Sequence, residues 1–227
     1  MKTIQEHVEA KFGIQFENTK ILDQAFYHSS YVNEHRNLDI ENNERLEFLG
    51  DAVLELIISD YLYGKYPSRP EGKLSKLRSS IVREESLSEY TKRCGFDAFL
   101  RLGRGEEATG GRERPSILCD LFESFLGALR LDKGVDAARN FIHEVIIPDI
   151  DAGKFEQEMD FKTKLQEKLQ TQGSVSIQYV LVSEEGPSHA KVFDVEAYVD
   201  GKKIGVGKGK SKKIAEQDAA RNALRQL

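Results

Sequence analysis

The apolar residues of the first 150 positions recur every three or four residues, without sustained alternation with polar ones. This spacing is typical of amphipathic helices, because about 3.6 residues make one helical turn. Gly and Pro residues separate the segments that show it. The spacing predicts helices over residues 22–27, 45–63, 73–94, 117–131 and 135–147. We therefore expect residues 1–150 to form an all-α domain, a helical bundle.

Two segments interrupt or end this pattern. Residues 103–112 combine Gly with charged side chains, which predicts a mobile loop. The segment lacks the glycine spacing of a phosphate-binding motif and follows no predicted strand, so we expect no nucleotide cofactor. Residues 151–160 are polar and weakly patterned, and we interpret them as a linker between two domains.

A different pattern follows this linker. Residues 161–171 and 212–227 have helical spacing. Between them, three segments are typical of half-buried strands, namely residues 177–182, 190–199 and 203–209. The dipeptide Asp200-Gly201 favours a tight hairpin turn between the last two. The order α-β-β-β-α predicts a small α+β domain over residues 161–227.

The composition fits a folded protein in a reducing compartment. Of the 227 residues, 39% are hydrophobic and 31% are charged, which excludes a disordered or collagen-like chain. No apolar run approaches the roughly 20 residues that span a bilayer, so we expect no membrane partner. Residues 1–7 become polar too soon for a secretory signal. Cys94 and Cys119 are too few for a disulfide framework, and a cytoplasmic protein with small buried cysteines is expected.

The charge is unevenly distributed along the chain. The net charge of −5 by itself argues against a nucleic-acid partner. Residues 160–227, however, carry twelve Lys and Arg against nine Asp and Glu, which leaves a net charge of −8 on residues 1–159. A basic tail on an acidic body indicates that one part contacts nucleic acid and the other part does something else.

Acidic residues stand in two otherwise apolar helical segments. Glu44, Glu47 and Asp51 fall within a narrow arc of one helix, because they occupy positions i, i+3 and i+7. Asp120 and Glu123 form a pair at i and i+3 of another. One interpretation is a solvated face on each helix. The other is that the two faces meet inside the bundle, where like charges are unfavourable unless a cation compensates them.

A meeting of these carboxylates would form a metal site. Oxygen ligands without His or Cys suit Mg²⁺ or Mn²⁺ rather than Zn²⁺. Proteins assemble such clusters for phosphoryl transfer. The pattern alone leaves open a nuclease or a helical metal enzyme that acts on a diphosphate substrate.

Residues 43–56, NERLEFLGDAVLEL, resemble the signature of the ribonuclease III family. The resemblance continues in family order through residues 28–35, 71–82 and 103–129 and the C-terminal domain, so it covers essentially the whole chain. It implies an Mg²⁺-dependent endoribonuclease, with Mn²⁺ as a substitute, that cleaves double-stranded RNA. It also implies 5′-phosphate and 3′-hydroxyl ends with short 3′ overhangs, and processing of ribosomal, messenger and transfer RNA precursors. The alternative is a catalytically silent protein that only binds duplex RNA.

The resemblance also implies roles for individual residues. The catalytic and metal-binding carboxylates of the family match Glu47, Asp51, Asp120 and Glu123. Further acidic residues of the catalytic valley match Glu44 and Glu71. An aromatic residue that crosses the subunit interface matches Phe48, which implies a homodimer. Cys119 and Arg130 depart from many members, and we expect neither to contact the chemistry.

Lysines crowd the start of the last predicted helix, after the predicted N-cap residue Ser211. Cations there oppose the helix dipole, which indicates an anionic ligand such as phosphate rather than a structural role. Together with the α-β-β-β-α order, this resembles a double-stranded RNA-binding domain, which reads duplex shape more than sequence. The resemblance assigns RNA contacts to Thr163, Gln166, Glu167, Pro187, His189, Lys210, Lys212 and Lys213.

Overall fold

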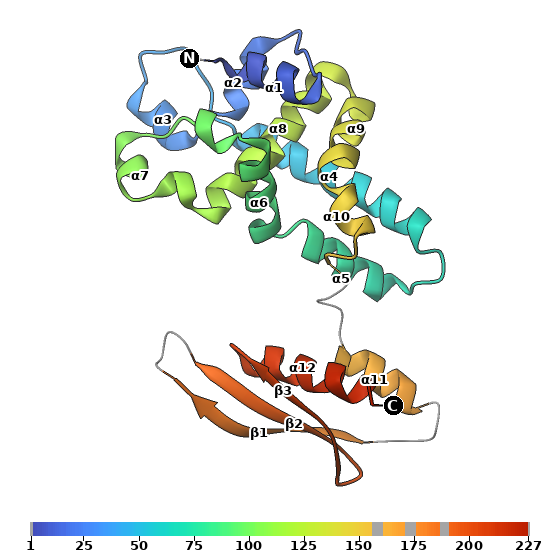
Figure 1. Cartoon of the computed structure of the whole chain (residues 1–227). Helices are drawn as coiled ribbons and strands as arrows, with labels where there is room; N and C mark the ends of the chain where they lie inside the picture. The colour runs from blue at the N-terminus through green and yellow to red at the C-terminus, as the bar shows by residue number, and fades with distance from the viewer. Residues whose placement is uncertain (1, 156–160, 171–175, 187–190, 227) are drawn as a thin grey trace. The chain divides into compact units, whose positions relative to one another are not determined.

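The computed structural model describes all residues except 1, 156–160, 171–175, 187–190 and 227. The chain forms two compact units, Met1–Gln157 and Glu158–Leu227 (Figure 1). Among the helices that the structure describes, none is both long and apolar enough to cross a membrane.

The first unit is helical, as predicted. Its helices are α1 (Ile4–Phe12), α2 (Thr19–Ala25), α3 (Ser29–Glu34), α4 (Glu44–Lys65), α5 (Glu71–Ile81), α6 (Glu84–Cys94), α7 (Arg104–Ala108), α8 (Pro115–Lys133), α9 (Val135–Val145) and α10 (Ile147–Asp151). Two short 3₁₀ turns, η1 (Asp97–Phe99) and η2 (Gly111–Glu113), precede and follow α7.

Helices α4 and α8 pack against each other at the centre of the first unit, and α6 packs on α8 (Figure 1). The facing sides of α4 and α8 supply fully buried side chains such as Leu54, Ile58, Leu121 and Phe125. Burial of each such side chain contributes roughly 1.5–3 kcal/mol to folding. The rings of Phe26 and Phe96 pack edge to face, and the ring of Phe125 packs on Phe96 at a tilt of 43°.

The single helix predicted over residues 73–94 is wrong, because two helices cover this range. Helix α5 ends at Ile81, and Arg83 has an extended backbone with φ −68° and ψ 156° before α6 begins. Glu84 and Glu85 stand in the first turn of α6, where acidic side chains favour a helix start. The apolar spacing continues across the break, so periodicity alone did not reveal it.

The loop predicted over residues 103–112 is also wrong, because it contains α7 and η2. Ion pairs stabilise these short turns: Arg112 pairs with Glu107 at 2.6 Å, and Arg114 pairs with Glu106. Arg112 also donates to the carbonyl oxygen of Asp97 at 2.6 Å. Charged residues that suggested a solvated loop therefore hold a folded segment.

The first unit continues past the predicted domain end at residue 150. Helix α10 includes Asp151, and Phe155 is only 4% exposed and packs in the core of this unit. Lys154 donates to Glu89 at 2.9 Å and to Asp149 at 3.2 Å. Residues 151–155, which the sequence suggested as linker, thus belong to the first unit.

The second unit has the predicted α-β-β-β-α order. Helix α11 (Phe161–Gln170) precedes β1 (Ile177–Glu185), β2 (Val192–Val199) and β3 (Lys202–Gly209), and α12 (Lys212–Leu224) follows them. The strands form an antiparallel sheet in the order β1-β2-β3. Asp200 and Gly201 both have positive φ, 49° and 79°, as the hairpin turn between β2 and β3 requires.

Small residues bring α12 close to this sheet. Its buried face consists of alanines such as Ala215 and Ala219. A Cβ atom at Gly205 or Gly207 of β3 would overlap the α12 backbone, so only glycine fits there. Leu165 of α11 completes the core.

Candidate functional site

Two glycines bring the acidic helices into backbone contact. A Cβ atom at Gly50 of α4 would overlap the carbonyl oxygen of Glu123, and one at Gly127 of α8 would overlap the carbonyl oxygen of Leu46. Each helix therefore lies against the backbone of the other at this crossing. Since Gly50 adjoins Asp51 and contacts the Glu123 backbone, the crossing itself positions the acidic residues.

The start of α4 is anchored by Asn43, which is 3% exposed. Its backbone N–H donates to the carbonyl oxygen of Tyr27 at 3.0 Å, and its Nδ2 donates to that of Ala25 at 3.4 Å. The hydroxyl of Ser124 on α8 donates to the Asn43 carbonyl at 3.3 Å. These bonds tie the first turn of α4, which carries Glu44 and Glu47, to α8.

Glu123 is the most deeply placed of the four matched carboxylates, with 9% exposure. Burial raises the pKa of Glu123 to about 8, and the charges of Asp51, Asp120 and Glu47 act in the same direction. The acidic faces of α4 and α8 therefore lie close enough for their charges to interact. Of the two interpretations of the acidic arcs, the structure has the one in which they meet.

The other three carboxylates are less deeply placed: Glu47 and Asp120 are half-buried, and Asp51 is exposed. Burial and then the charge of Glu84 raise the pKa of Asp120 to about 6. Burial raises the pKa of Glu47, with Asp120 as the next cause. Burial and the charge of Glu55 raise the pKa of Asp51.

The influence of Glu84 was missed in the sequence analysis. Glu84 is the first residue of α6, a helix whose start the apolar spacing did not reveal. The acidic pair Glu84-Glu85 is a helix-start signal, and it could have located α6. Its position beside α8 depends on tertiary packing, which no local pattern specifies.

Cys119, which we expected not to contact the chemistry, lies beside one of the matched carboxylates. The Sγ atom of Cys119 lies 3.8 Å from Oε1 of Glu123. Single ligand atoms of Cys119, Asp120 and Glu123 all lie within 4.8 Å of one another. Arg130 is exposed near the end of α8.

Glu44, Glu71 and Phe48 are all exposed. Glu44 is exposed, and its charge contributes to the raised pKa of Glu47. Glu71 is exposed at the start of α5 and accepts a local hydrogen bond from Ser75 at 2.7 Å, and no interaction with the four carboxylates is found for it among the described residues. Phe48 follows Glu47 on α4 and is 81% exposed.

The donor set of this cluster fits a hard divalent cation. Glu47, Asp51, Asp120 and Glu123 offer carboxylate oxygens, the ligands that Mg²⁺ and Mn²⁺ prefer. Burial first, and next the charges of nearby carboxylates, raise the pKa values of Asp120 and Glu123, and among the described residues neither forms an ion pair that would compensate its charge. A bound cation would supply that compensation.

The second unit presents its basic residues differently. Ser211 caps α12 by accepting from the Ile214 N–H at 3.3 Å, as predicted. Lys210, Lys212 and Lys213 are all exposed around this helix start. Among the described residues, none of the three lysines forms an ion pair. Ser211 occupies the N–H of Ile214, whereas the charges of these exposed lysines can attract an anion.

The remaining predicted RNA contacts are only partly described. On α11, Thr163 is half-buried, and Gln166 and Glu167 are exposed. Pro187 and His189 lie outside the described residues.

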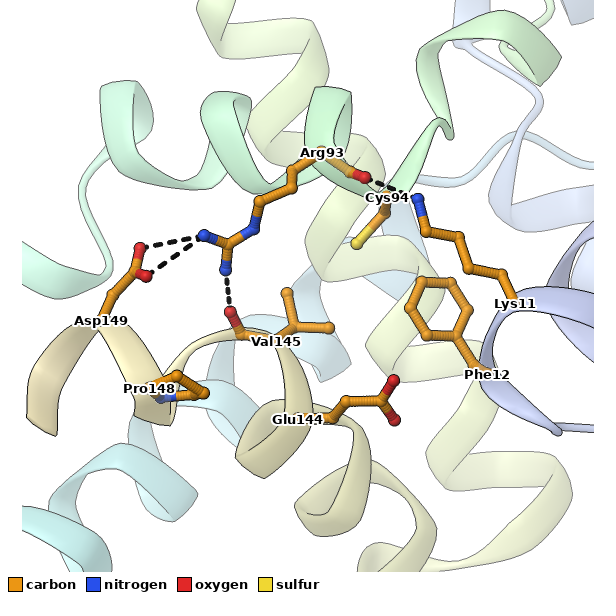
Figure 2. A pocket seen from close by; sticks show the side chains of 8 residues that line it. All are labelled: Lys11, Phe12, Arg93, Cys94, Glu144, Val145, Pro148 and Asp149. Carbon is orange, nitrogen blue, oxygen red and sulfur yellow. Dashed lines mark hydrogen bonds and ion pairs between the residues drawn. The ribbon is translucent and has the colours of Figure 1, made fainter. Parts of the chain in front are cut away.

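A pocket of about 290 Å³ lies elsewhere in the first unit, between α1, α6, the end of α9 and α10 (Figure 2). Its cations are already engaged: Lys11 donates to the carbonyl of Arg93 at 2.7 Å, and Arg93 donates to both carboxylate oxygens of Asp149. Cys94 lines the pocket, but none of the matched carboxylates does. It is separate from the acidic cluster.

Two family profiles match most of this chain. Residues 18–150 match a family described as Ribonuclease-III-like. This chain belongs to the ribonuclease III family. Residues 161–227 match the double-stranded RNA binding motif. As a family member, the chain is an endoribonuclease that acts on double-stranded RNA, which confirms what the sequence resemblance implied.

Relatives that match nearly the whole chain, and a solved structure of a nuclease domain, support the same family assignment. Ribonuclease 3 of Enterococcus faecalis is 60% identical over 220 residues, 97% of this chain and 96% of the relative. Ribonuclease 3 of Streptococcus gordonii is 59% identical over 224 residues, 99% and 97% of the two chains. The nuclease domain of ribonuclease III from Campylobacter jejuni matches 66% of this chain and 97% of its own, with 37% identity and a TM-score of 0.59.

Proposed function

We propose that Glu47, Asp51, Asp120 and Glu123 hold Mg²⁺, for which Mn²⁺ can substitute, and that this ribonuclease III family member cleaves duplex RNA with it. The observation that supports the proposal is the convergence of these carboxylates at the crossing of α4 and α8. Their burial and mutual repulsion raise the pKa of Glu123 to about 8. Such an arrangement is unfavourable unless a cation binds there.

Held by these four side chains, such a metal would supply Lewis-acid chemistry, namely activation of water and stabilisation of charge on a phosphate. The side chains of the cluster act as ligands only when deprotonated, so Glu123 must release its proton first. The contact between Gly50 and the Glu123 backbone keeps the ligands of α4 and α8 at a constant separation. The proposed products carry 5′-phosphate and 3′-hydroxyl ends with short 3′ overhangs.

The second unit supplies the affinity for the duplex in this proposal. Lys210, Lys212 and Lys213 contact phosphates, and Thr163, Gln166 and Glu167 contact the neighbouring groove together with Pro187 and His189. Phosphate and shape contacts carry little sequence information. The proposed substrates are therefore structured precursors of ribosomal, messenger and transfer RNA, and the proposed compartment is the cytoplasm. Both cysteines, Cys94 and Cys119, are free, in keeping with that compartment.

We further propose a homodimer whose interface includes α4. Phe48, Leu56 and Tyr63 of this helix are 81%, 54% and 78% exposed, and large exposed apolar patches mark interaction sites. A second structure of the Campylobacter jejuni nuclease domain is described as showing structural flexibility in a region involved in dimer formation. It has 37% identity and a TM-score of 0.57, and it covers 62% of this chain and 94% of its own. Two subunits would supply one site for each RNA strand.

Analytical ultracentrifugation at micromolar concentration tests the proposed dimer. Phe48→Ala should weaken association, because it removes the most exposed of the three apolar side chains. A monomeric mass for the wild type would contradict the dimer. A dimer that is unchanged in Phe48→Ala would remove this residue from the interface.

The cleavage proposal is tested with purified protein and an end-labelled RNA hairpin, in Mg²⁺ or in excess chelator. A single-stranded RNA of the same composition is the control. Cleavage of the hairpin alone, only with Mg²⁺, is the expected result. Binding of the hairpin without cleavage would instead indicate a catalytically silent RNA-binding protein. Hydrolysis of a small diphosphate without RNA cleavage would favour the other alternative.

A further inference from the structure

Three aromatic side chains form a stack between the end of α2 and the turn that follows α3. The rings of Tyr27 and Tyr31 are 5.5 Å apart between centroids, and their planes meet at 27°. The ring of His35 lies on Tyr31 at 4.1 Å and 28°. All three side chains are half-buried. The stack is therefore partly open to solvent rather than enclosed in the core.

The stack ends at His35, whose ring is held in place. Its Nδ1 lies 2.8 Å from the carbonyl oxygen of Tyr31, and it is the donor because a carbonyl only accepts. The N–H of Leu38 donates to the His35 carbonyl at 2.8 Å, which closes a turn. Within the described part of the chain, Tyr31 is the only ring packed on His35. The second face of the imidazole is thus left without an aromatic neighbour.

The groups around this open face suit a nucleotide. Arg36 follows His35 in the turn and is exposed, and its side chain forms no ion pair or hydrogen bond with the residues that the structure describes. The hydroxyls of Tyr27 and Tyr31 form no hydrogen bond with those residues either. Unpaired bases stack on flat aromatic rings, and guanidinium groups pair with phosphate. A ring and a free cation on adjacent residues combine both contacts.

The stack also adjoins the acidic helix α4. The carbonyl oxygen of Tyr27 accepts from the N–H of Asn43, the residue that anchors the start of α4, at 3.0 Å. Burial lowers the pKa of His28, and the charges of Glu106 and Glu44 oppose this change. The residue after Tyr27 therefore lies within reach of the charge of Glu44. An RNA whose phosphate lies at the carboxylates of α4 has further nucleotides near the stack.

A base inside a perfect duplex is stacked between its neighbours and offers no free face to a side chain. Only an unpaired base can lie on the open face of His35. We propose that His35 stacks on one unpaired base of the RNA and that Arg36 contacts its phosphate, so that the enzyme prefers duplexes with an unpaired nucleotide near the cleaved bond. The inference rests on the proposed function, because it takes the attacked phosphate to lie at the carboxylates of α4 and α8.

The test compares the binding of matched RNA hairpins to the full-length protein in chelator, where cleavage is blocked. Each hairpin carries one unpaired adenosine at successive positions along the stem, or an abasic nucleotide at the same place. Wild type should bind the adenosine form about 5- to 150-fold more tightly at one position, the factor typical of one base–aromatic stack. The fluorescent base 2-aminopurine at that position should be quenched by the protein.

Variants of His35 separate stacking from simple packing. His35→Leu keeps an apolar side chain but removes the ring, so adenosine and abasic hairpins should bind equally and the quenching should disappear. His35→Phe restores a ring and should restore both. His143→Leu is the control, because His143 is exposed on α9 and its ring meets Tyr61 edge-on at 89°. It should retain the wild-type preference. Circular dichroism establishes that each variant is folded.

Arg36→Gln tests the phosphate contact at an exposed position. This variant should bind adenosine and abasic hairpins more weakly by the same factor, with a less steep dependence of log K on log salt. A salt slope equal to that of wild type would refute the contact. Because Arg36→Gln and the abasic comparison leave His35 in place, they test the site even if His35→Leu fails to fold.

Three results would overturn the inference: equal binding of adenosine and abasic hairpins by wild type at every position, a preference that persists in His35→Leu, or one lost in His143→Leu. A smaller mass of RNA-free His35→Leu in ultracentrifugation would also overturn it, because a second copy of the chain would then cover the stack. Failure of the proposed function gives a different result. In that case Mg²⁺ supports cleavage of none of these hairpins, whatever their relative affinities in chelator.

Discussion

The two units of this protein use charged side chains in opposite ways. In the first unit, like charges of α4 and α8 are brought together and partly buried, and the pKa of Glu123 rises to about 8. In the second unit, Lys210, Lys212 and Lys213 stay exposed around the start of α12. Preorganised, poorly solvated ligands suit a chemical step at one phosphate. Exposed, screened charges suit the holding of a long polyanion.

The two units also differ in the size of the side chains that fill their interiors. Helices α4 and α8 are covered by large side chains such as Phe122 and Phe125, which are fully buried. In the second unit, the alanine face of α12 lies on the glycines of β3. A large core can offset the cost of buried carboxylates, and a small one with surface lysines has no such cost to offset. Substitutions at the carboxylate cluster should therefore change cleavage and stability, whereas substitutions at the exposed lysines should change RNA binding.

The largest effect is expected for Glu123→Gln. The amide keeps the size of the side chain but removes a ligand charge, so cleavage should fall by about three orders of magnitude or more. Duplex binding by the second unit should be nearly unchanged. Single-turnover cleavage and filter binding of a hairpin measure the two quantities. Glu144→Gln, at an exposed carboxylate in the separate pocket, is the control, and a rate above a few per cent of wild type in Glu123→Gln would refute the assignment.

Gly50→Ala should cost several kcal/mol of stability, because the new methyl group overlaps the Glu123 carbonyl and the helices must separate. Gly64→Ala is a matched control in the same helix, where a Cβ has nothing within 4 Å. The control should be neutral or stabilising by up to about 1 kcal/mol. Urea unfolding followed by circular dichroism compares them. Equal stability of the two variants would mean that the crossing is not as tight as described.

The metal-free protein should lose a few kcal/mol of stability as pH rises. The Glu123 carboxyl in the unfolded chain releases its proton near the ordinary pKa of 4.5, but in the folded protein its pKa is about 8. The folded state binds this proton more tightly than the unfolded state. The stability that it contributes is therefore lost as pH rises from about 4.5 to about 8. Thermal unfolding in chelator across this range measures it. Glu123→Gln should flatten the dependence, and Mg²⁺ should restore stability most near pH 8, whereas a flat wild-type profile would contradict the raised pKa.

The smallest effect is expected for Lys212→Ala combined with Lys213→Ala. Each lost phosphate contact should make log K less steep against log salt by about 0.9, if the value for B-DNA holds for duplex RNA. Relative affinities for different sequences should hardly change. Lys202→Ala, at the exposed start of β3, serves as control. A salt slope equal to that of wild type would show that these lysines only solvate the surface.

The sequence predicted most of what depends on local pattern. Spacing located α4 and α8, and it put Glu47 and Asp51 on one arc and Asp120 and Glu123 on another. The family resemblance added that the arcs belong together. Features that depend on contacts between distant segments escaped: the break before α6, and the sulfur of Cys119 beside Glu123.

Two other differences between the predicted and the observed structure also arise from contacts that local composition does not specify. Ion pairs between residues several positions apart, such as that of Arg112 with Glu107, stabilise turns in a segment whose composition is typical of a loop. Phe155 was assigned to a linker because its neighbours are polar, yet it fills a space in the core of the first unit. Composition describes the average of a segment, whereas one aromatic side chain decides where it packs.

The crossing at Gly50 and Gly127 also has a consequence for motion. Where side chains separate two helices, rotamer exchange and local repacking let the distance between the axes fluctuate. Here peptide groups touch directly, and peptide groups are planar and stiff. The backbone of residues 46–51 and 123–127 should therefore be among the most rigid parts of the first unit on the picosecond to nanosecond timescale, with amide order parameters near the roughly 0.85 of rigid backbone. The carboxylates on these helices can therefore exchange protons and ligands while the backbone atoms that bear them stay in place.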